Sequence, residues 1–400
     1  MANVCDDERD HKMLIEALSN ATRVVENESF DPNDDNGDGG GGDGGDNDDD
    51  DDQDKQRQHR YHPTGIDLLT ELEKRWNDLI VATTATTTTT TTNTTEAAIK
   101  DVSSEADGTK DIQSSSSSSS SSSSLASFWF QKLYDQHNES GRYYHTMVHL
   151  WEMFQLLDIL LSTQKNNASS SSYYIPMAWA IFFHDAVYDP KSNQNEKDSA
   201  KLFHEFYNTY YYYCKEEIHE QSNNMNMNMN VNVNVNMNMN RRRMMNNVTF
   251  ENISTMIIAT EKHEVILPTT YQHRLLSTTT EAPSGEEDDD DEIEFILQMQ
   301  RYFLDIDMTV LGKRQNAYLK YASLIRKEFA FVPRDVYCTK RAEILETFLG
   351  DGSSSSRSSS NKRYIYLTKT FREAFEGRAR ENLRDEINLL RKNIIPGEKE

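Results

Sequence analysis

Seven low-complexity tracts interrupt this 400-residue chain and limit how much of it can pack into a folded core. Each tract repeats one or two kinds of small, polar or acidic residue, so it cannot bury enough apolar surface to offset the entropy lost on ordering. The tracts are a Gly/Asp tract at 31–54, a Thr run around 84–95, Ser runs at 114–124, 169–172 and 353–360, a Met-Asn and Val-Asn repeat at 225–240, and a Thr-then-acid segment at 277–292. We therefore expect each tract to be disordered.

The positions of these tracts predict the domain organisation. We expect residues 1–64 to form a mostly disordered acidic region and residues 65–392 to form one helical domain. The expected inserts within that domain are 83–124, 221–247, 277–292 and 351–360, and a short tail follows at 393–400.

The charge of the chain limits its partners. The net charge is -24, and most of the excess comes from twelve Asp at 31–54 and seven consecutive acids at 286–292. A chain without a basic stripe lacks what neutralisation of nucleic-acid phosphates requires. The longest apolar run, 177–183, falls far short of the roughly 20 residues that a bilayer-spanning helix needs. We predict no nucleic-acid partner and no membrane partner, and the oligomeric state stays open.

The cysteines and the N-terminus predict a cytoplasmic protein. Cys5, Cys214 and Cys338 are odd in number and widely spaced, so they indicate neither a disulfide framework nor a Cys-x-x-Cys metal site. The first twelve residues are polar and contain acids, unlike a secretory or transit signal.

Between the tracts, apolar residues recur every three or four positions, which is typical of amphipathic helices. Residues 65–82 show the pattern first, with apolar residues at 66, 69, 72, 76 and 79. The same periodicity runs through 143–161, 194–213, 250–261, 293–304, 314–330, 336–349 and 369–391. The sequence therefore predicts an all-α fold, a single helical bundle interrupted by inserts.

Two histidine-containing motifs point to chemistry. His145 and His149 lie four residues apart, so on a helix their side chains leave the same face about one turn apart. This spacing suits metal ligands or a catalytic pair, although two histidines on a solvated surface also show it. His184-Asp185 follows the most apolar segment of the chain, where burial is costly unless the two groups are paired or bind a metal.

A third motif contains two carboxylates, Asp305 and Asp307, within an apolar stretch. An N-cap role at the start of a helix explains one of these aspartates, but it does not explain both at once. Two histidines and two aspartates from three helices would bind a divalent cation such as Mn, Fe, Zn or Mg through nitrogen and oxygen, leaving positions for water.

The order His, His-Asp, Asp resembles the HD superfamily of metal-dependent phosphohydrolases, and more narrowly a family of predicted HD-type phosphohydrolases. The motifs that carry this resemblance are Arg142-Tyr-Tyr-His145-x-x-x-His149, His184-Asp-Ala-Val-Tyr-Asp189, Asn195-Glu-x-x-Ser-Ala200 and Asp305-x-Asp307-x-x-x-Leu-Gly312. The segments after residue 313 are similar to the C-terminal helices of that family. The resemblance implies an HD-like helical bundle with a bound divalent ion.

The resemblance also implies residue roles. It makes His149, His184, Asp185 and Asp307 the metal ligands, with Asp185 also holding the attacking water and Asp305 as the alternative to Asp307. By similarity to the His-Asn-x-x-His of cyclic-nucleotide phosphodiesterases, His145 is the general acid. Arg142 before His145 leaves open a register in which the two histidines exchange roles. Thr146 stands where the family has Asn, so the hydrogen bond that this Asn would make to support the metal ligands is changed.

Substrate contacts are expected from Arg142, Lys262 and His263. The two cations are candidates for phosphate oxygens or solvated surface charges, and His263 matches a family position that faces substrate or a second ion. The expected function is hydrolysis of a phosphoester, nucleotide-like or a small phosphorylated metabolite, by metal-activated water. The alternatives are a diiron oxygenase on the same scaffold and a non-catalytic, metal-stabilised binding module.

Overall fold

The computed structural model describes residues 11–20, 67–85, 119–163, 169–226, 247–272, 286–350 and 364–397. Within these ranges the chain is all-α, with 78% of the residues in helices and no strand. The fold class expected from the helical periodicity is therefore confirmed. No helix in the described ranges has a stretch that is both long and apolar enough to span a lipid bilayer.

The labelled elements follow one another in two groups along the chain. Those before residue 260 are α3 (Leu68–Ala85), α5 (Ser119–His137), α6 (Met147–Thr163), α7 (Ser169–Phe183), α8 (Asn195–Asn226) and α9 (Asn247–Ala259). Those after it are α11 (Glu286–Asp307), the 3-10 helix η3 (Met308–Gly312), α12 (Gln315–Glu328), α13 (Arg334–Leu349), α14 (Lys369–Phe371), the π-helical turn η4 (Arg372–Glu376) and α15 (Gly377–Leu390).

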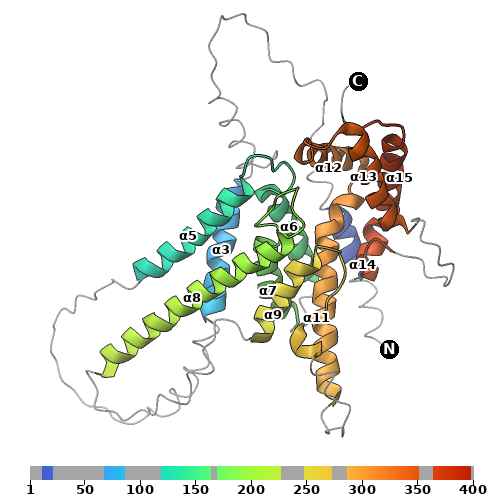
Figure 1. Ribbon diagram of the computed structural model, residues 1–400. Coiled ribbons are helices and arrows are strands. Elements are labelled where there is room, and N and C mark those ends of the chain that lie inside the picture. The colour runs from blue at the N-terminus through green and yellow to red at the C-terminus, as the bar shows by residue number, and fades with distance from the viewer. Residues whose placement is uncertain are drawn as a thin grey trace, which may run out of the picture.

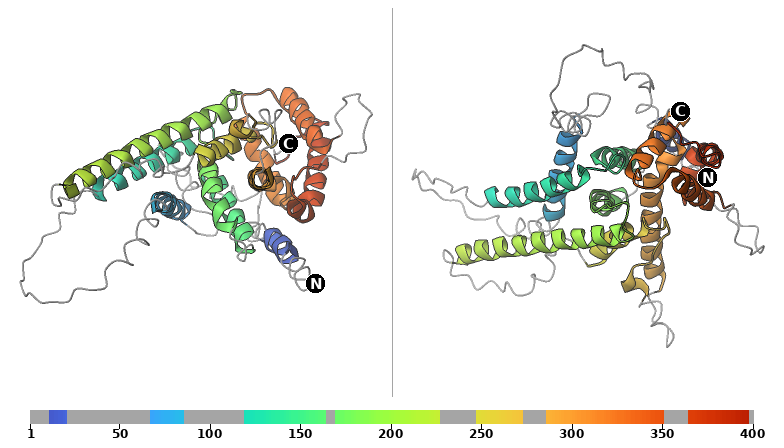
Figure 2. Two further views of the ribbon diagram at one scale, coloured as in Figure 1. Left: turned by 90° about the horizontal axis from the view of Figure 1, so that it is seen from below. Right: turned by 45° about the horizontal axis from the view of Figure 1, so that its top comes forward.

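Helix α11 stands between two groups of helices (Figure 1). On one side are α3, α5 and α8, and on the other are α12, α13 and α15, while α6, α7 and α9 pack close to α11. Turned views show α5 and α8 extending together away from the remaining helices (Figure 2). The middle of the molecule is therefore formed by α6, α7 and α11.

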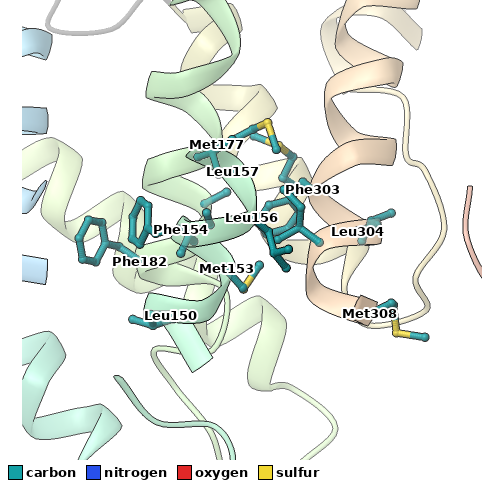
Figure 3. Packing of buried hydrophobic residues seen from close by; sticks show 14 of the residues in the cluster. Leu150, Met153, Phe154, Leu156, Leu157, Met177, Phe182, Phe303, Leu304 and Met308 are labelled. Carbon is teal, nitrogen blue, oxygen red and sulfur yellow. The ribbon is translucent and has the colours of Figure 1, made fainter. Parts of the chain in front are cut away.

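The interface of these three helices is densely apolar (Figure 3). Leu157 of α6, Met177 of α7 and Phe303 of α11 are completely buried in it. Helix α6 faces the core along one stripe because its apolar residues recur with helical spacing, from Leu150 through Met153 to Leu157. In Figure 3, Leu150 at the start of α6 and Met308, which directly follows α11, lie toward the same end of this packed group.

Packed residues also lie outside the expected bounds of the helical domain, at both of its ends. Residues 11–20 form a helix within the region expected to be mostly disordered, and Leu14 and Leu18 of this helix are buried. Their spacing of four places both on one face, which joins the core. Ile395, in the expected tail, is also buried. Apolar residues at these two ends thus belong to the packed structure.

Helices also extend into three expected inserts. Helix α3 ends at Ala85, α5 begins at Ser119, α8 continues to Asn226 and α11 begins at Glu286. The start of α11 lies in the acidic run at 286–292. The rest of these inserts, and the whole insert at 351–360, lie outside the described residues.

The Ser patch at 169–172 is likewise helical, contrary to expectation. It forms the first turn of α7, so Pro176 lies inside the helix. A proline inside a helix removes one intrahelical hydrogen bond and crowds the carbonyl group four residues earlier. The burial of the apolar residues that follow, from Met177 to Phe183, outweighs that loss.

Candidate metal centre

Three helix ends bring together the four residues expected to be ligands. His149 lies in the first turn of α6, His184-Asp185 follows the last residue of α7, and Asp307 is the last residue of α11. The two histidines are buried, whereas the side chains of Asp185 and Asp307 are 19% and 15% exposed. The site therefore sits at one end of the α6–α7–α11 core, with its carboxylates on the solvent side.

The donor atoms of these residues face one another. The Nε2 atoms of His149 and His184 are 3.3 Å apart. Asp185 Oδ2 lies 3.1 Å from His184 Nε2, and Asp307 Oδ1 lies 3.1 Å from His149 Nε2. Two donors that each lie about 2.1 Å from one ion at a right angle are about 3 Å apart. His149, His184 and Asp185 thus form a group that could hold a metal ion.

The hydrogen bond behind His184 sets the state of its ring. Nδ1 of His184 lies 3.0 Å from the carbonyl oxygen of Ile181, so Nδ1 donates and the lone pair of neutral His184 is on Nε2, facing the cluster. Metal-binding histidines commonly have this arrangement. The donor chemistry therefore fits a divalent cation.

In the absence of a metal ion, the acids of the cluster favour protonation of the His184 ring. Burial alone lowers the pKa of His184, but Asp185 and Asp307 oppose this and raise it to about 9. In return, burial raises the pKa of Asp307, but hydrogen bonds from His149 and His263 hold it well below its usual range. A metal ion must displace the proton from His184, so ion affinity should rise with pH.

Asp305 and Asp307 differ in what they contact. Asp305 accepts hydrogen bonds from the backbone N–H groups of Leu367 and Thr368, at 2.6 and 2.8 Å, and from the Thr368 hydroxyl at 2.6 Å. Burial raises the pKa of Asp305 to about 7, against the effect of these donors. Asp305 and Asp307 are two positions apart on a helix, so their side chains point in directions about 200° apart. Only Asp307 therefore faces the histidines.

His145 lies beside the cluster rather than in it. Its ring centroid is 6.3 Å from that of His149, and its Nδ1 donates to Glu328 Oε2 at 2.8 Å. Burial lowers the pKa of His145, but Glu328 and Asp185 outweigh burial and raise it. Of the two registers left open by the sequence, the geometry matches the one with His149 in the cluster and His145 outside it.

Glu328, the last residue of α12, is a site residue that sequence reasoning missed. Its side chain is fully buried. One oxygen accepts from the backbone N–H groups of residues 143, 144 and 145 at 2.7–3.1 Å, and the other accepts from His145 and from the Tyr188 hydroxyl. Burial raises the pKa of Glu328, but His145 and these N–H groups lower it to about 2. The carboxylate thus fixes the ring of His145.

Arg142 contacts the backbone of the turn that carries Asp185. Its guanidinium donates to the carbonyl oxygens of Asp185, at 2.6 Å, and Ala186, at 2.9 Å. The side chain is only 2% exposed. This position makes Arg142 a residue that shapes the turn, and its expected contact with substrate stays a prediction.

The other two expected substrate residues lie after α9. Lys262 is exposed. His263 has a φ of 52°, a left-handed conformation that is uncommon for a residue other than glycine, and its Nε2 lies 3.2 Å from Asp307 Oδ2. Strained backbone of this kind is concentrated at functional sites. His263 therefore belongs to the cluster, on the side of Asp307 opposite His149.

Comparison with known proteins returned nothing for this chain: no family model, no curated protein and no solved structure matches it.

Proposed function

We propose that this chain is a metal-dependent phosphohydrolase of the HD type, which cleaves a phosphoester of a nucleotide or of a small phosphorylated metabolite. One observation carries the proposal: donor atoms from three helix ends face one another at 3.1–3.3 Å beside a histidine whose orientation is fixed by a buried carboxylate. The order of the motifs along the sequence supports the same assignment.

The residues that would hold the ion are His149, His184, Asp185 and Asp307. Two imidazoles and two carboxylates suit Mn, Fe, Zn or Mg, since nitrogen and oxygen donors of this kind accept each of them. A divalent ion held there would polarise phosphoryl oxygens and lower the pKa of a water molecule.

His145 would donate a proton to the leaving oxygen. Its Nδ1 is committed to Glu328, so Nε2 is the atom that can transfer a proton. The raised pKa of His145 keeps that proton in place near neutral pH. General acid catalysis of this kind typically contributes roughly 10²–10⁴-fold in rate. Asp185 has a second carboxylate oxygen that can orient the attacking water.

The test compares Asp185→Ala with Asp78→Ala, a substitution of an exposed aspartate on α3. We expect the natural chain and Asp78→Ala to bind one divalent ion and to hydrolyse a member of a phosphoester panel. Asp185→Ala should lose more than about 100-fold in ion affinity, since losing a residue that merely supports a ligand already costs roughly 10–100-fold.

Elemental analysis and turnover are measured on the same samples. Unchanged ion content and turnover in Asp185→Ala would contradict the proposal. Two irons per chain with oxygen uptake would instead indicate the diiron oxygenase. A bound ion that raises thermal stability without any turnover would indicate a binding module.

A further inference from the structure

Side chains from elsewhere in the chain fix the backbone of the loop that follows α7. Arg142 donates to two carbonyl oxygens at the start of this loop. Ser199 Oγ accepts from the N–H of Val187 at 3.0 Å and donates to its carbonyl oxygen at 3.2 Å. The Asn195 amide accepts from the N–H of Asp189 at 3.0 Å and donates to its carbonyl oxygen at 2.9 Å. A loop with hydrogen bonds of this kind along its backbone is held in one conformation.

This loop carries both Asp185 and Tyr188. The ring of Tyr188 lies 4.2 Å from the ring of His145, at an angle of 31°. The hydroxyl of Tyr188 donates to Glu328 Oε2 at 2.9 Å, and the same oxygen lies 2.8 Å from Nδ1 of His145. Tyr188 therefore contacts the imidazole directly through its ring and indirectly through the carboxylate that both groups share.

The contacts of Tyr188 restrict a motion that the Glu328 hydrogen bond leaves open. A hydrogen bond at one ring nitrogen tolerates a range of angles, so an imidazole held only at Nδ1 can tilt about that atom. An aromatic ring packed against the imidazole opposes this tilt. Because Tyr188 and Asp185 belong to one fixed loop, the ring of His145 is also held relative to Asp185.

Proton transfer depends strongly on such placement. In the proposed reaction, Nε2 of His145 gives its proton to the oxygen that leaves phosphorus, next to the ion that Asp185 would hold. Donor and acceptor must come within about 2.6–3.2 Å for this transfer. A misplacement of about 1 Å can cost roughly 10²-fold in rate. A residue that fixes the place of His145 relative to Asp185 therefore affects the rate of this step.

On the basis of the function proposed above, we propose that Tyr188 is a positioning residue, which ties the general acid His145 to the loop that carries Asp185. Tyr188 transfers no proton itself, because its hydroxyl proton is donated to Glu328. Its contribution is the placement of the His145 ring. Changes at Tyr188 should therefore impair reactions that need the proton from His145 and spare ion binding.

The kinetic test compares two leaving groups in Tyr188→Phe, which loses the hydroxyl, and Tyr188→Leu, which also loses the ring. The substrates are benzyl phosphate and p-nitrophenyl phosphate, each also as its methyl diester, with the metal-loaded full chain. A benzyl alkoxide leaves poorly without a proton, whereas nitrophenolate leaves readily. We expect kcat for the benzyl ester to fall by about 10²-fold in Tyr188→Leu and by less in Tyr188→Phe. The nitrophenyl ester should lose much less, and ion affinity, measured by equilibrium dialysis, should not change.

Tyr174→Phe is the matched control, since Tyr174 is a partly buried tyrosine of α7 whose hydroxyl hydrogen-bonds with Arg75. It should leave kcat for both leaving groups unchanged. Equal losses on the two leaving groups, or no loss on the benzyl ester in either Tyr188 variant, overturn the proposal. If the natural chain hydrolyses none of the four esters, the phosphohydrolase is contradicted instead, and the role of Tyr188 is decided by the ring of His145 alone.

A spectroscopic measurement tests the placement of that ring without any turnover. The Nδ1 proton of His145, hydrogen-bonded to Glu328, should give a proton NMR signal in water that is absent from His145→Asn. We expect its exchange with solvent to be about tenfold faster in Tyr188→Leu than in the natural chain or Tyr174→Phe, because the ring is free to tilt away from the carboxylate. An unchanged exchange rate in a Tyr188→Leu chain that keeps its circular dichroism spectrum contradicts the role of Tyr188.

Discussion

The two carboxylates of the last turn of α11 have different roles, although they are only two residues apart. Asp305 contacts the 367–368 turn and accepts three hydrogen bonds from N–H and O–H groups of the fold. Asp307 faces the imidazoles of His149 and His263, on opposite sides of its carboxylate. A carboxylate whose lone pairs are used by the fold holds structure, whereas one that faces ring nitrogens is available to an ion.

Glu328 and Asp185 also differ in whether their oxygens are used by hydrogen bonds of the fold. Glu328 accepts from five donors on two stretches of chain, and its side chain has no exposed surface. Asp185 is partly exposed, and its nearest charged neighbour is the ring of His184. The molecule therefore has two carboxylates that position parts of the site and two that face the ring nitrogens, where they could bind an ion.

The largest effect is expected for Asp307→Ala compared with Asp305→Ala. Asp307→Ala should lower ion affinity by more than about 100-fold, with little loss of folding free energy. Asp305→Ala should leave ion affinity within a few fold and reduce the free energy of unfolding by about 3 kcal/mol, because the buried N–H and O–H groups of Thr368 and the partly buried N–H of Leu367 lose their acceptor. Equilibrium dialysis with elemental analysis and urea unfolding measure the two quantities. The reverse pattern would show that the assignments of Asp305 and Asp307 are exchanged.

A smaller effect is expected for Glu328→Gln. Glutamine keeps the size of the side chain but removes the negative charge that raises the pKa of His145. With that pKa lowered, His145 loses its proton at lower pH, so the basic limb of the pH–rate profile should move to lower pH. Turnover of a phosphoester with an alkyl leaving group should fall by about 10²-fold, and turnover of a nitrophenyl ester by less.

Glu343→Gln, which changes an exposed glutamate on α13, is the control for this experiment. It should leave the pH profile unchanged. An unshifted basic limb in Glu328→Gln, with folding intact, would mean that Glu328 does not act through His145.

The smallest effect is expected for removal of the ion. At an ion concentration ten times Kd, binding stabilises the folded chain by about 1.4 kcal/mol. Chelation should therefore lower Tm by roughly 3–6 °C. Asp305→Ala should keep this shift on a lower baseline, whereas Asp307→Ala should lose it. Differential scanning calorimetry with and without chelator measures both, and an equal shift in the two variants would contradict the comparison.

Short-range patterns in the sequence were sufficient to predict part of this structure. The spacing of three and four residues indicated helices, and the all-α fold confirms it. His145 and His149 stood out through their spacing, and His184-Asp185 through its place after an apolar run. Asp305 and Asp307 could not be separated in this way, because both interrupt the same apolar segment and the difference lies in residues 367 and 368.

Glu328 shows most clearly what local sequence patterns cannot predict. Nothing near it in the sequence marks it, since a glutamate at the end of an amphipathic helix is ordinarily solvated. It became part of the site because it is buried against residues 143–145, about 183 positions away. The helix at residues 11–20 was missed for the same reason, since its burial depends on a surface formed by distant helices.

By itself, the sequence determined where helices form and which residue types can bind a cation, because periodicity and side-chain chemistry are local properties. Only the tertiary structure decided which carboxylate faces the histidines, which histidine is held by Glu328, and that Arg142 supports a turn. These outcomes depend on contacts between segments that lie far apart along the chain. Their geometry is set by the packing of α6, α7, α11 and α12, and no local pattern encodes it.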